Sequence, residues 1–311
     1  MRLVFLGSPP FATPVLAGLL ASRHHVLTLV TRPDKPRGRG RRVEASPLVE
    51  LARARGVPVV QPPSARDAAF AAELAALAPD ILLVASYGEI LDRTVLELAP
   101  RGALNVHASL LPRHRGASPI QAAILAGDAE TGVSIQRMVL ALDEGDVLLE
   151  KRTAIGPEEN AGQLLERLAG LGADAAVEGL DLVESGNAAF RPQDPARATY
   201  ARRIRKEAGR VDWTRSAAEI VRHVRAMTPW PGARATAPNG KEILLLDAVE
   251  APEPATQHEP GARVGDAGGL VVAAGKGAVL VRALKPAGGS PLASDAWLRG
   301  ARLPADARFG S

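Results

Sequence analysis

Short apolar runs alternate with longer helical patterns through the first half of the chain. The runs at residues 3–6, 26–30, 81–85 and 104–107 predict strands. Residues 81–85 are wholly apolar, as expected for a strand that is buried on both faces. Strands separated by helices at this spacing indicate βαβ units. We therefore predict an α/β fold built on a mostly parallel, doubly wound sheet.

Helical periodicity fills the intervals between these runs. Ser46 is a good N-cap residue, and Pro47 is tolerated in the first turn of a helix. Residues 57–60 form a further short strand, which we expect at a sheet edge because Pro58 cannot donate to a neighbouring strand. The predicted helices are residues 11–20, 46–55, 65–77, 118–126 and 161–185.

The pattern changes in the second half. Residues 186–208 contain turn-type dipeptides and few apolar residues, which indicates a linker. Residues 217–227 predict one amphipathic helix, with Ser216 as N-cap and Glu219 completing a capping box. Later β-type segments between Gly- and Pro-rich turns predict a small β-barrel. The predicted organisation is an α/β domain over residues 1–187, a linker over 188–208 and a β-barrel over 209–311.

Composition narrows the class of protein. The chain has 311 residues, 46% hydrophobic and 23% charged, which fits a folded protein with room for two domains. It has no cysteine, so disulfides, thiolate metal sites and a cysteine nucleophile are excluded. No apolar stretch has the length of a signal peptide core or a bilayer span, so we expect no membrane association and a cytoplasmic location.

Arginine is concentrated in two segments. The net charge is only +4, but residues 32–42 and 202–225 are both rich in Arg. Clustered guanidinium groups suit planar, bidentate contacts to phosphate, as in RNA; the alternative is a pair of solvated, charged surfaces. Aromatic residues make up only 3% of the chain, which argues against a base-stacking platform for single strands.

Two polar side chains interrupt the apolar run at residues 104–107. Asn105 and His107 are two positions apart, so in a strand they project from the same face, near the carboxyl end where ligands of parallel sheets bind. An amide that stabilises an oxyanion and an imidazole that moves a proton are equipment for acyl transfer. The alternative is a satisfied polar pair in the core. Asp143, taken alone, is a turn residue, and the sparse carboxylates around it predict no metal site.

Several motifs carry a resemblance to a known family. They are G-S-P-P at 7–10, R-P-D-K-P-R-G-R-G at 32–40, N-V-H-A-S-L-L-P-R-H-R-G at 105–116, L-D-E-G-D at 142–146, P-W-P at 229–231 and L-K-P-A-G-G at 284–289. Over nearly its whole length the chain resembles the methionyl-tRNA formyltransferases. The N-x-H and L-D-x-G-D pair resembles any enzyme that uses 10-formyltetrahydrofolate, and the Arg-rich loop and C-terminal half narrow the match. His114 stands where the family often has Trp or Tyr.

The resemblance implies transfer of a formyl group from 10-formyltetrahydrofolate to the α-amino group of initiator methionyl-tRNA. It implies a formyltransferase-type Rossmann-like domain followed by an OB-like β-barrel. Asn105 would stabilise the oxyanion, His107 would assist proton transfer, and Asp143 would orient the imidazole. The implied folate contacts are Tyr87, Gly88, Ser109, Leu110, Leu111 and Pro112. The implied tRNA contacts are Arg37, Arg39, Arg41, Arg42, Arg203 and Lys206.

Two other functions remain open from the residues. The first is a different formyltetrahydrofolate enzyme, acting on an amino sugar or a ribonucleotide amine, or hydrolysing the donor. The second is a non-catalytic RNA-binding protein, which explains the Arg segments but leaves Asn105, His107 and Asp143 without a purpose. The family resemblance favours a monomer.

Overall fold

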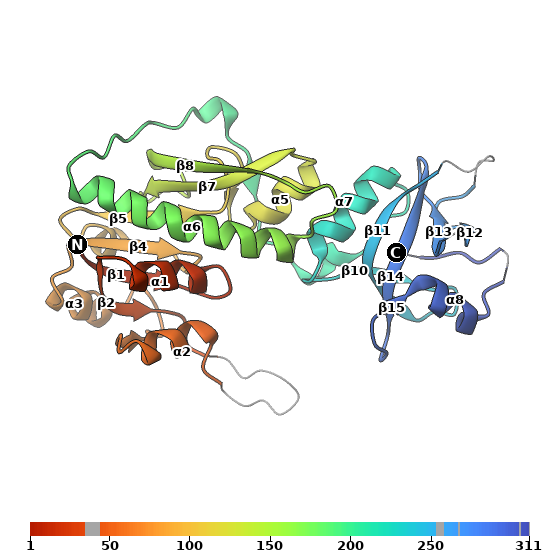
Figure 1. The fold of residues 1–311 in the computed structure, drawn as a ribbon, viewed down its shortest axis with the longest axis horizontal. Helices are drawn as coiled ribbons and strands as arrows, with labels where there is room; N and C mark the ends of the chain where they lie inside the picture. The colour runs from red at the N-terminus through yellow and green to blue at the C-terminus, as the bar shows by residue number, and fades with distance from the viewer. Residues whose placement is uncertain (35–43, 253–257, 267, 305, 311) are drawn as a thin grey trace. The chain divides into compact units, whose positions relative to one another are not determined.

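The contacts within the chain divide it into two compact units. The computed structural model describes residues 1–34, 44–252, 258–266, 268–304 and 306–310 (Figure 1). The first unit comprises residues 1–119, 130–154 and 165–202, and the second comprises residues 120–129, 155–164 and 203–311. Residues 155–164 join the second unit because Glu158 forms an ion pair with Arg282 at 2.7 Å, and Arg225 donates to the carbonyl of Gly156.

A seven-stranded sheet forms the centre of the first unit. Its strand order is β3-β2-β1-β4-β5-β7-β8, in which the pairs from β3 to β5 are parallel and β7 and β8 are antiparallel. The predicted mostly parallel sheet is thus confirmed. The short strand β3, which directly follows Pro58, lies at the edge of this sheet as expected. The strands are β1 (Arg2–Gly7), β2 (His25–Val30), β3 (Val59–Val60), β4 (Ile81–Ala85), β5 (Ala103–His107), β7 (Glu130–Arg137) and β8 (Val147–Ala154).

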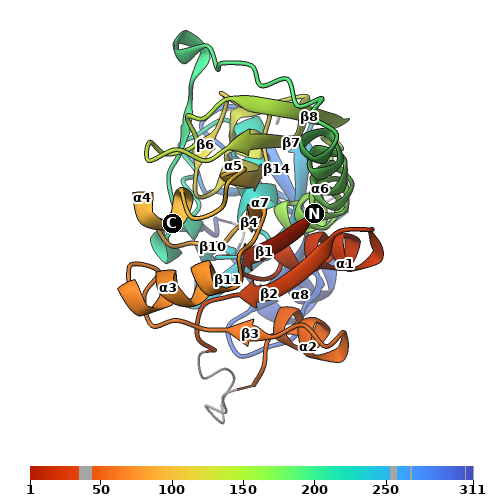
Figure 2. The same ribbon diagram turned by 90° about the vertical axis from the view of Figure 1, so that its left-hand side faces the viewer.

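Helices cover both faces of this sheet. The helices whose residues lie wholly or partly in the first unit are α1 (Ala12–Ala21), α2 (Pro47–Ala54), α3 (Ala68–Ala76), α4 (Arg93–Leu96), α5 (Pro119–Ala126) and α6 (Ala161–Glu184). Figure 2 shows α1 and α6 on one face and α3 and α4 on the other. A Cβ built on Gly18 would lie 2.9 Å from the Cβ of Ala173, so the close packing of α1 on α6 requires a glycine there.

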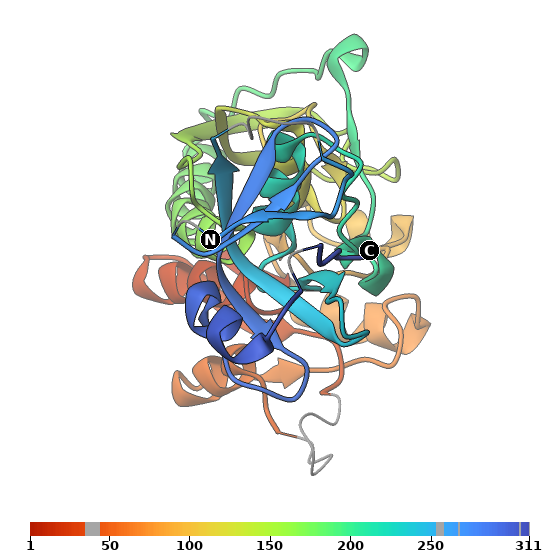
Figure 3. The ribbon, with the colours of Figure 1, turned by 90° about the vertical axis from the view of Figure 1, so that its right-hand side faces the viewer.

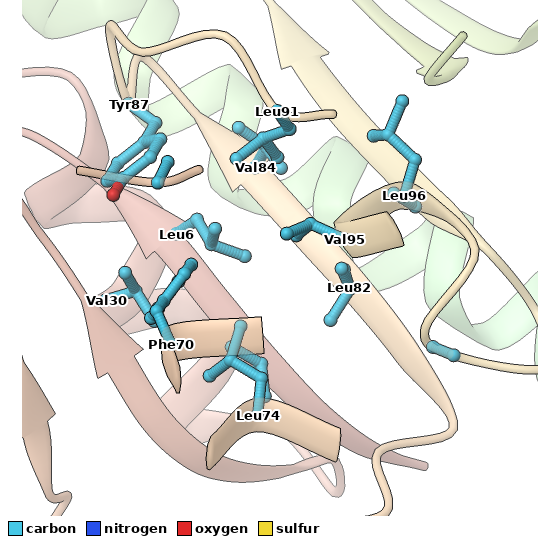
Figure 4. Packing of buried hydrophobic residues seen from close by; sticks show 14 residues of the cluster. Leu6, Val30, Phe70, Leu74, Leu82, Val84, Tyr87, Leu91, Val95 and Leu96 are labelled. Atoms are coloured by element: carbon cyan, nitrogen blue, oxygen red, sulfur yellow. The ribbon is translucent and has the colours of Figure 1, made fainter. Parts of the chain in front are cut away.

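A row of paired residues on neighbouring strands leads from the apolar core to Asn105. Leu6 pairs with Val30 and with Val84, and Val84 pairs with Asn105 in parallel register. The apolar members belong to the core on the α3 side of the sheet (Figure 4). Asn105 therefore continues an apolar row with a polar side chain, at the edge of that core.

The second unit contains an antiparallel sheet and helices, among them residues 120–126 of α5. Its strand order is β10-β11-β14-β13-β12, with β15 paired to β14, and the sheet curls as an OB-like domain does (Figure 3). Ser216 and Glu219 form the predicted capping box at the start of α7. The elements are α7 (Ala217–Met227), β10 (Ala233–Thr236), β11 (Glu242–Ala251), β12 (Arg263–Gly265), β13 (Leu270–Ala273), β14 (Ala278–Pro286), β15 (Leu292–Ala293) and α8 (Ser294–Ala301).

Part of the segment expected to be a linker packs on the first unit. The short strand β9 (Tyr200–Ala201) pairs in parallel with β6 (Arg115–Gly116). Arg191 exchanges backbone hydrogen bonds with Val147 at the start of β8. Two 3₁₀ turns, η1 (Pro195–Arg197) and η2 (Lys206–Gly209), lie along the same segment. The domain limits 1–187, 188–208 and 209–311 stay a prediction.

Within the described residues, no helix combines the length and the apolar character needed to cross a membrane.

Candidate functional site

Asn105, His107 and Asp143 meet at the carboxyl end of β5. The Asn105 Nδ2 donates to Asp143 Oδ1 at 3.3 Å, and the His107 Nδ1 lies 3.7 Å from Asp143 Oδ2. The side chains of His107 and Asp143 are 6% and 11% exposed, so water screens this contact poorly. A turn residue far along the chain thus faces two side chains of one strand.

The hydrogen-bond partner of His107 Nε2 shows that this nitrogen carries a hydrogen. His107 Nε2 lies 3.0 Å from the backbone oxygen of His114, a group that can only accept. Nε2 therefore carries hydrogen and donates, and Nδ1 is the nitrogen that faces Asp143. His114 itself has a φ of 57° and is buried, and its backbone oxygen contacts His107.

Two further groups donate to the Asp143 carboxylate, and the sequence pattern alone did not identify them. Gln136 Nε2 donates to Oδ1 at 2.8 Å, and the backbone N–H of Gly116 donates to Oδ2 at 2.8 Å. Gln136 lies opposite Asn105 in antiparallel register and is 1% exposed. Gln136 occupies a regular polar position in the alternation of residues 133–136, so the pattern gave no reason to single it out.

The loop after β5 is fixed from the neighbouring strand. Ser134 is fully buried; its Oγ donates to the carbonyl of Ser109 at 2.7 Å and accepts from the backbone N–H of Leu111 at 3.0 Å. Ser109 Oγ donates to the carbonyl of Arg113, and Leu111 is buried. Of the expected folate contacts in this loop, Leu110 and Pro112 are partly exposed. The side chains of Ser109 and Leu111 are thus occupied by contacts within the protein.

A second group of expected contacts lies where β1 and β4 end. Ser8 is buried, and its Oγ donates to the carbonyl of Tyr87 at 3.1 Å while accepting from the Nε of Arg32 at 3.3 Å. Gly88 has a φ of 80°, and a Cβ there would lie 3.4 Å from the Cζ of Arg32. Burial, with a smaller effect of Glu89, raises the pKa of Tyr87 to about 12. The Tyr87 ring therefore stays neutral near neutral pH, and its backbone oxygen accepts from Ser8.

A cavity of about 870 Å³ opens near the start of β5, and none of Asn105, His107 and Asp143 lines it. Ala103 lines it, two positions before Asn105 on β5, and so does Met138, two positions after Gln136. Because strand side chains alternate, Ala103 and Met138 share the face of Asn105 and Gln136. The guanidinium of Arg137 lies 4.2 Å above the ring of Phe190 at its rim. The lining mixes apolar side chains with the charged groups of Arg93, Glu97, Arg101 and Arg137.

The expected tRNA contacts fall into two groups. Arg203 and Lys206 lie in the second unit and are exposed. Lys206 lines a cavity of about 300 Å³ together with Arg210 and Arg234. The remaining contacts lie outside the described residues; they are Arg37, Arg39, Arg41 and Arg42.

A grouping with the chemistry of metal ligands lies away from this site. His24, Asp181 and Glu184 bring their ligand atoms within 4.8 Å of one another in the described part of the chain. His24 directly precedes β2, so it lies at the amino end of that strand, whereas the site lies at the carboxyl end of β5. Arg23 pairs with both carboxylates, at 2.7 and 2.8 Å. The acidic groups are therefore already neutralised by a cation.

The chain is similar to known formyl-transferring proteins. Residues 1–180 match the formyl transferase family, and residues 203–302 match the formyl transferase C-terminal domain. A methionyl-tRNA formyltransferase of Anaeromyxobacter dehalogenans is 49% identical over 90% of this chain and 90% of its own length. One of a Roseiflexus species is 43% identical over 100% of this chain and 95% of its own.

The fold also matches a solved structure. HypX from Aquifex aeolicus in complex with tetrahydrofolic acid aligns with a TM-score of 0.63 at 20% identity. The alignment covers 96% of this chain and 47% of that protein, so the chain spans about half the length of HypX. At this identity the likeness concerns the fold alone.

Proposed function

Because the chain belongs to the methionyl-tRNA formyltransferase family, we propose that it moves a formyl group from 10-formyltetrahydrofolate to the α-amino group of initiator methionyl-tRNA. The observation that carries the proposal is the meeting of Asn105 and His107 with Asp143 at the ligand-binding edge of the sheet. Family membership removes the alternative of a non-catalytic RNA-binding protein.

The geometry supports a direct transfer. The neutral amine adds to the formyl carbon, and the carbonyl oxygen becomes negative. Asn105 carries two N–H groups; Asp143 uses one, and the second donates to that oxygen. One such donor is typically worth about 3 to 4 kcal/mol of transition-state stabilisation. The bond from carbon to N10 then breaks, the amine loses a proton, and N10 gains one.

His107 supports the same steps through its charge. With Nε2 held by the carbonyl of His114, a proton on Nδ1 makes the ring a cation beside Asp143. This cation stabilises the negative oxygen, and the Nδ1 proton is the one that the site can exchange with N10. Asp143 holds the ring in orientation and balances its charge.

The two substrates have separate candidate contacts. We assign the donor ring to the carboxyl ends of β4 and β5, where Tyr87, Gly88 and residues 109–112 lie. We assign the tRNA to the basic residues, among them Arg203 and Lys206, because their charges suit contacts to phosphate. The domain limits of residues 1–187 and 209–311 follow this division. We further propose that the enzyme is a monomer and acts in the cytoplasm, where translation begins.

A three-arm assay tests the function. The protein is incubated with donor labelled in the formyl group and with charged initiator tRNA, an amino-sugar nucleotide, or no acceptor. Label on methionine attached to tRNA is the expected result. Label on the sugar, or free formate at the same rate without acceptor, assigns another formyltetrahydrofolate reaction instead.

Single-turnover rates test the site. Asn105→Ala, His107→Ala and Asp143→Ala should each lower formyl transfer by about 10² or more while the fold is retained. Lys241→Ala is the control, because Lys241 is exposed in a turn of the second unit. Near-normal rates in all three site variants would exclude the catalytic assignment.

A further inference from the structure

The turn that carries Asp143 is held by a side chain from the segment expected to be a linker. Gln193 Nε2 donates to the backbone oxygens of Asp143 at 2.8 Å and of Gly145 at 2.7 Å. It also lies 3.4 Å from the Oε1 of Gln136, whose own amide donates to the Asp143 carboxylate. One amide group therefore contacts both the turn and the residue that supports the carboxylate.

A buried arginine fixes the other end of Gln193. Arg115 donates to Gln193 Oε1 through Nε at 3.1 Å and Nη2 at 2.9 Å. Its Nη1 pairs with Glu144, the residue after Asp143, at 3.1 Å. The Arg115 side chain is 5% exposed, so these bonds form in a poorly solvated setting. The orientation of the Gln193 amide is thereby determined: its oxygen faces Arg115 and its nitrogen faces the turn.

The turn needs such support because its backbone is strained. Asp143 has a φ of 53°, in the left-handed region that non-glycine residues rarely occupy. Such a conformation costs free energy and persists only where neighbouring groups enforce it. Gln193 binds the carbonyls of Asp143 and Gly145, one on the strained residue and one just beyond it.

We propose that Gln193, oriented by Arg115, is a positioning residue that holds the Asp143 turn in its reactive geometry. The proposal rests on the proposed formyl transfer, because Asp143 is the group through which Gln193 acts. Displacement of a reacting group by about 1 Å can lower a rate about 10²-fold, so a residue that contacts no substrate can still control turnover.

Two variants separate hydrogen bonding from packing. Gln193→Met keeps the length and removes the amide, and Gln193→Glu keeps the acceptor for Arg115 but places a carboxylate against two carbonyl oxygens. Both should lower kcat by about tenfold or more and leave KM for both substrates within about twofold. Gln163→Met is the control, because Gln163 is exposed and its side chain accepts from the backbone N–H of Asn160, at the start of its own helix.

A double-mutant cycle with Asp143→Asn identifies the route of the effect. If Gln193 acts through Asp143, Gln193→Met should cost less than about twofold in single-turnover rate once Asp143 is replaced. The same cost in both backgrounds, an unchanged kcat in the single variants, or a loss confined to KM would overturn the proposal. Because wild-type transfer is measured first, its absence would count against the proposed function and not against Gln193.

Hydrogen exchange gives a readout that needs no activity. The Gly116 amide, which donates to Asp143 Oδ2, should exchange faster in Gln193→Met than in the wild type, with the Gln163→Met control unchanged. Unaltered protection of the Gly116 amide in a folded Gln193→Met protein would show that the turn does not depend on Gln193.

Discussion

The amide of Asn105 and the carboxylate of Asp143 form a 3.3 Å hydrogen bond between a strand and a distant turn. Asn105 continues the buried row that includes Leu6 and Val84, whereas Asp143 belongs to a turn with a partly exposed surface. The bond orients the Asn105 amide, so that its second N–H is directed to one position. Orientation of that donor is what distinguishes an oxyanion site from a polar side chain in a core.

Asn105→Asp should be more damaging than Asn105→Ala near neutral pH. The substitution replaces the donor with an acceptor and sets two carboxyls side by side, where one of them binds a proton more readily than an isolated carboxyl does. As the pH falls, that proton restores a donor, so the single-turnover rate of Asn105→Asp should rise relative to that of Asn105→Ala. A constant ratio of the two rates from about pH 8 to about pH 5 would contradict the role of this hydrogen bond.

Gly145→Ala should impair both stability and turnover. A Cβ at Gly145 would overlap the backbone oxygen of Arg137, so the turn that carries Asp143 must shift. We expect at least about a tenfold loss of kcat together with a lower Tm. Gly170→Ala is the matched control: a Cβ there meets nothing within 4 Å in α6, and the helix should gain about 0.5 to 1 kcal/mol. Equal behaviour of the two variants would exclude steric control of the turn.

Tyr87→Phe should leave activity intact and not reduce stability. Among the described residues the Tyr87 hydroxyl is buried without a hydrogen-bond partner, so its removal deletes an unsatisfied group and should stabilise the fold by up to about 1 kcal/mol. Urea unfolding measures this change, with the exposed Tyr200→Phe as control. A raised KM for the folate donor would show instead that the hydroxyl binds substrate, contrary to a contact through the backbone.

The stability of the second unit should fall as His223 is forced to take up a proton. Burial lowers the pKa of His223; Arg215 lowers it further, whereas the Gly209 backbone and Asp212 raise it. With a folded-state pKa below the unfolded value of about 6.5, the contribution is present above that value and is lost as the pH falls through the folded pKa. His223→Gln should therefore have a lower Tm than the wild type at about pH 8, and this difference should shrink or reverse at about pH 5. A Tm difference independent of pH would contradict this assignment.

The helices and strands of the sheet follow closely from local patterns. The run at 81–85 coincides with β4, and the capping box of Ser216 and Glu219 starts α7 as expected. These elements were predictable because buried strands and capped helices carry their signals within a few residues. The short strands β6 and β9 carry too few residues for any period, and α4 is a single turn. Tertiary pairing stabilises them, so local patterns could not reveal them.

The candidate site was predictable only in part. Asn105 and His107 stand out because polar residues interrupt an apolar strand. Gln136 did not stand out, because it occupies an ordinary polar position in the alternating pattern of β7. Gln193 left none, since a glutamine in a turn-rich segment looks like any solvated residue until the chain folds back onto the Asp143 turn.

The sequence by itself determined the α/β pattern, the polar pair on β5 and, through its motifs, the family. These features depend on residue spacing and residue chemistry, which the chain carries locally. Only the tertiary structure decided that Asp143 faces both members of the pair, that the carbonyl of His114 occupies His107 Nε2, and that Gln193 supports the turn. Each of these contacts joins segments that come together only when the sheet and the returning segment pack, because hydrogen bonds between distant residues depend on the whole fold.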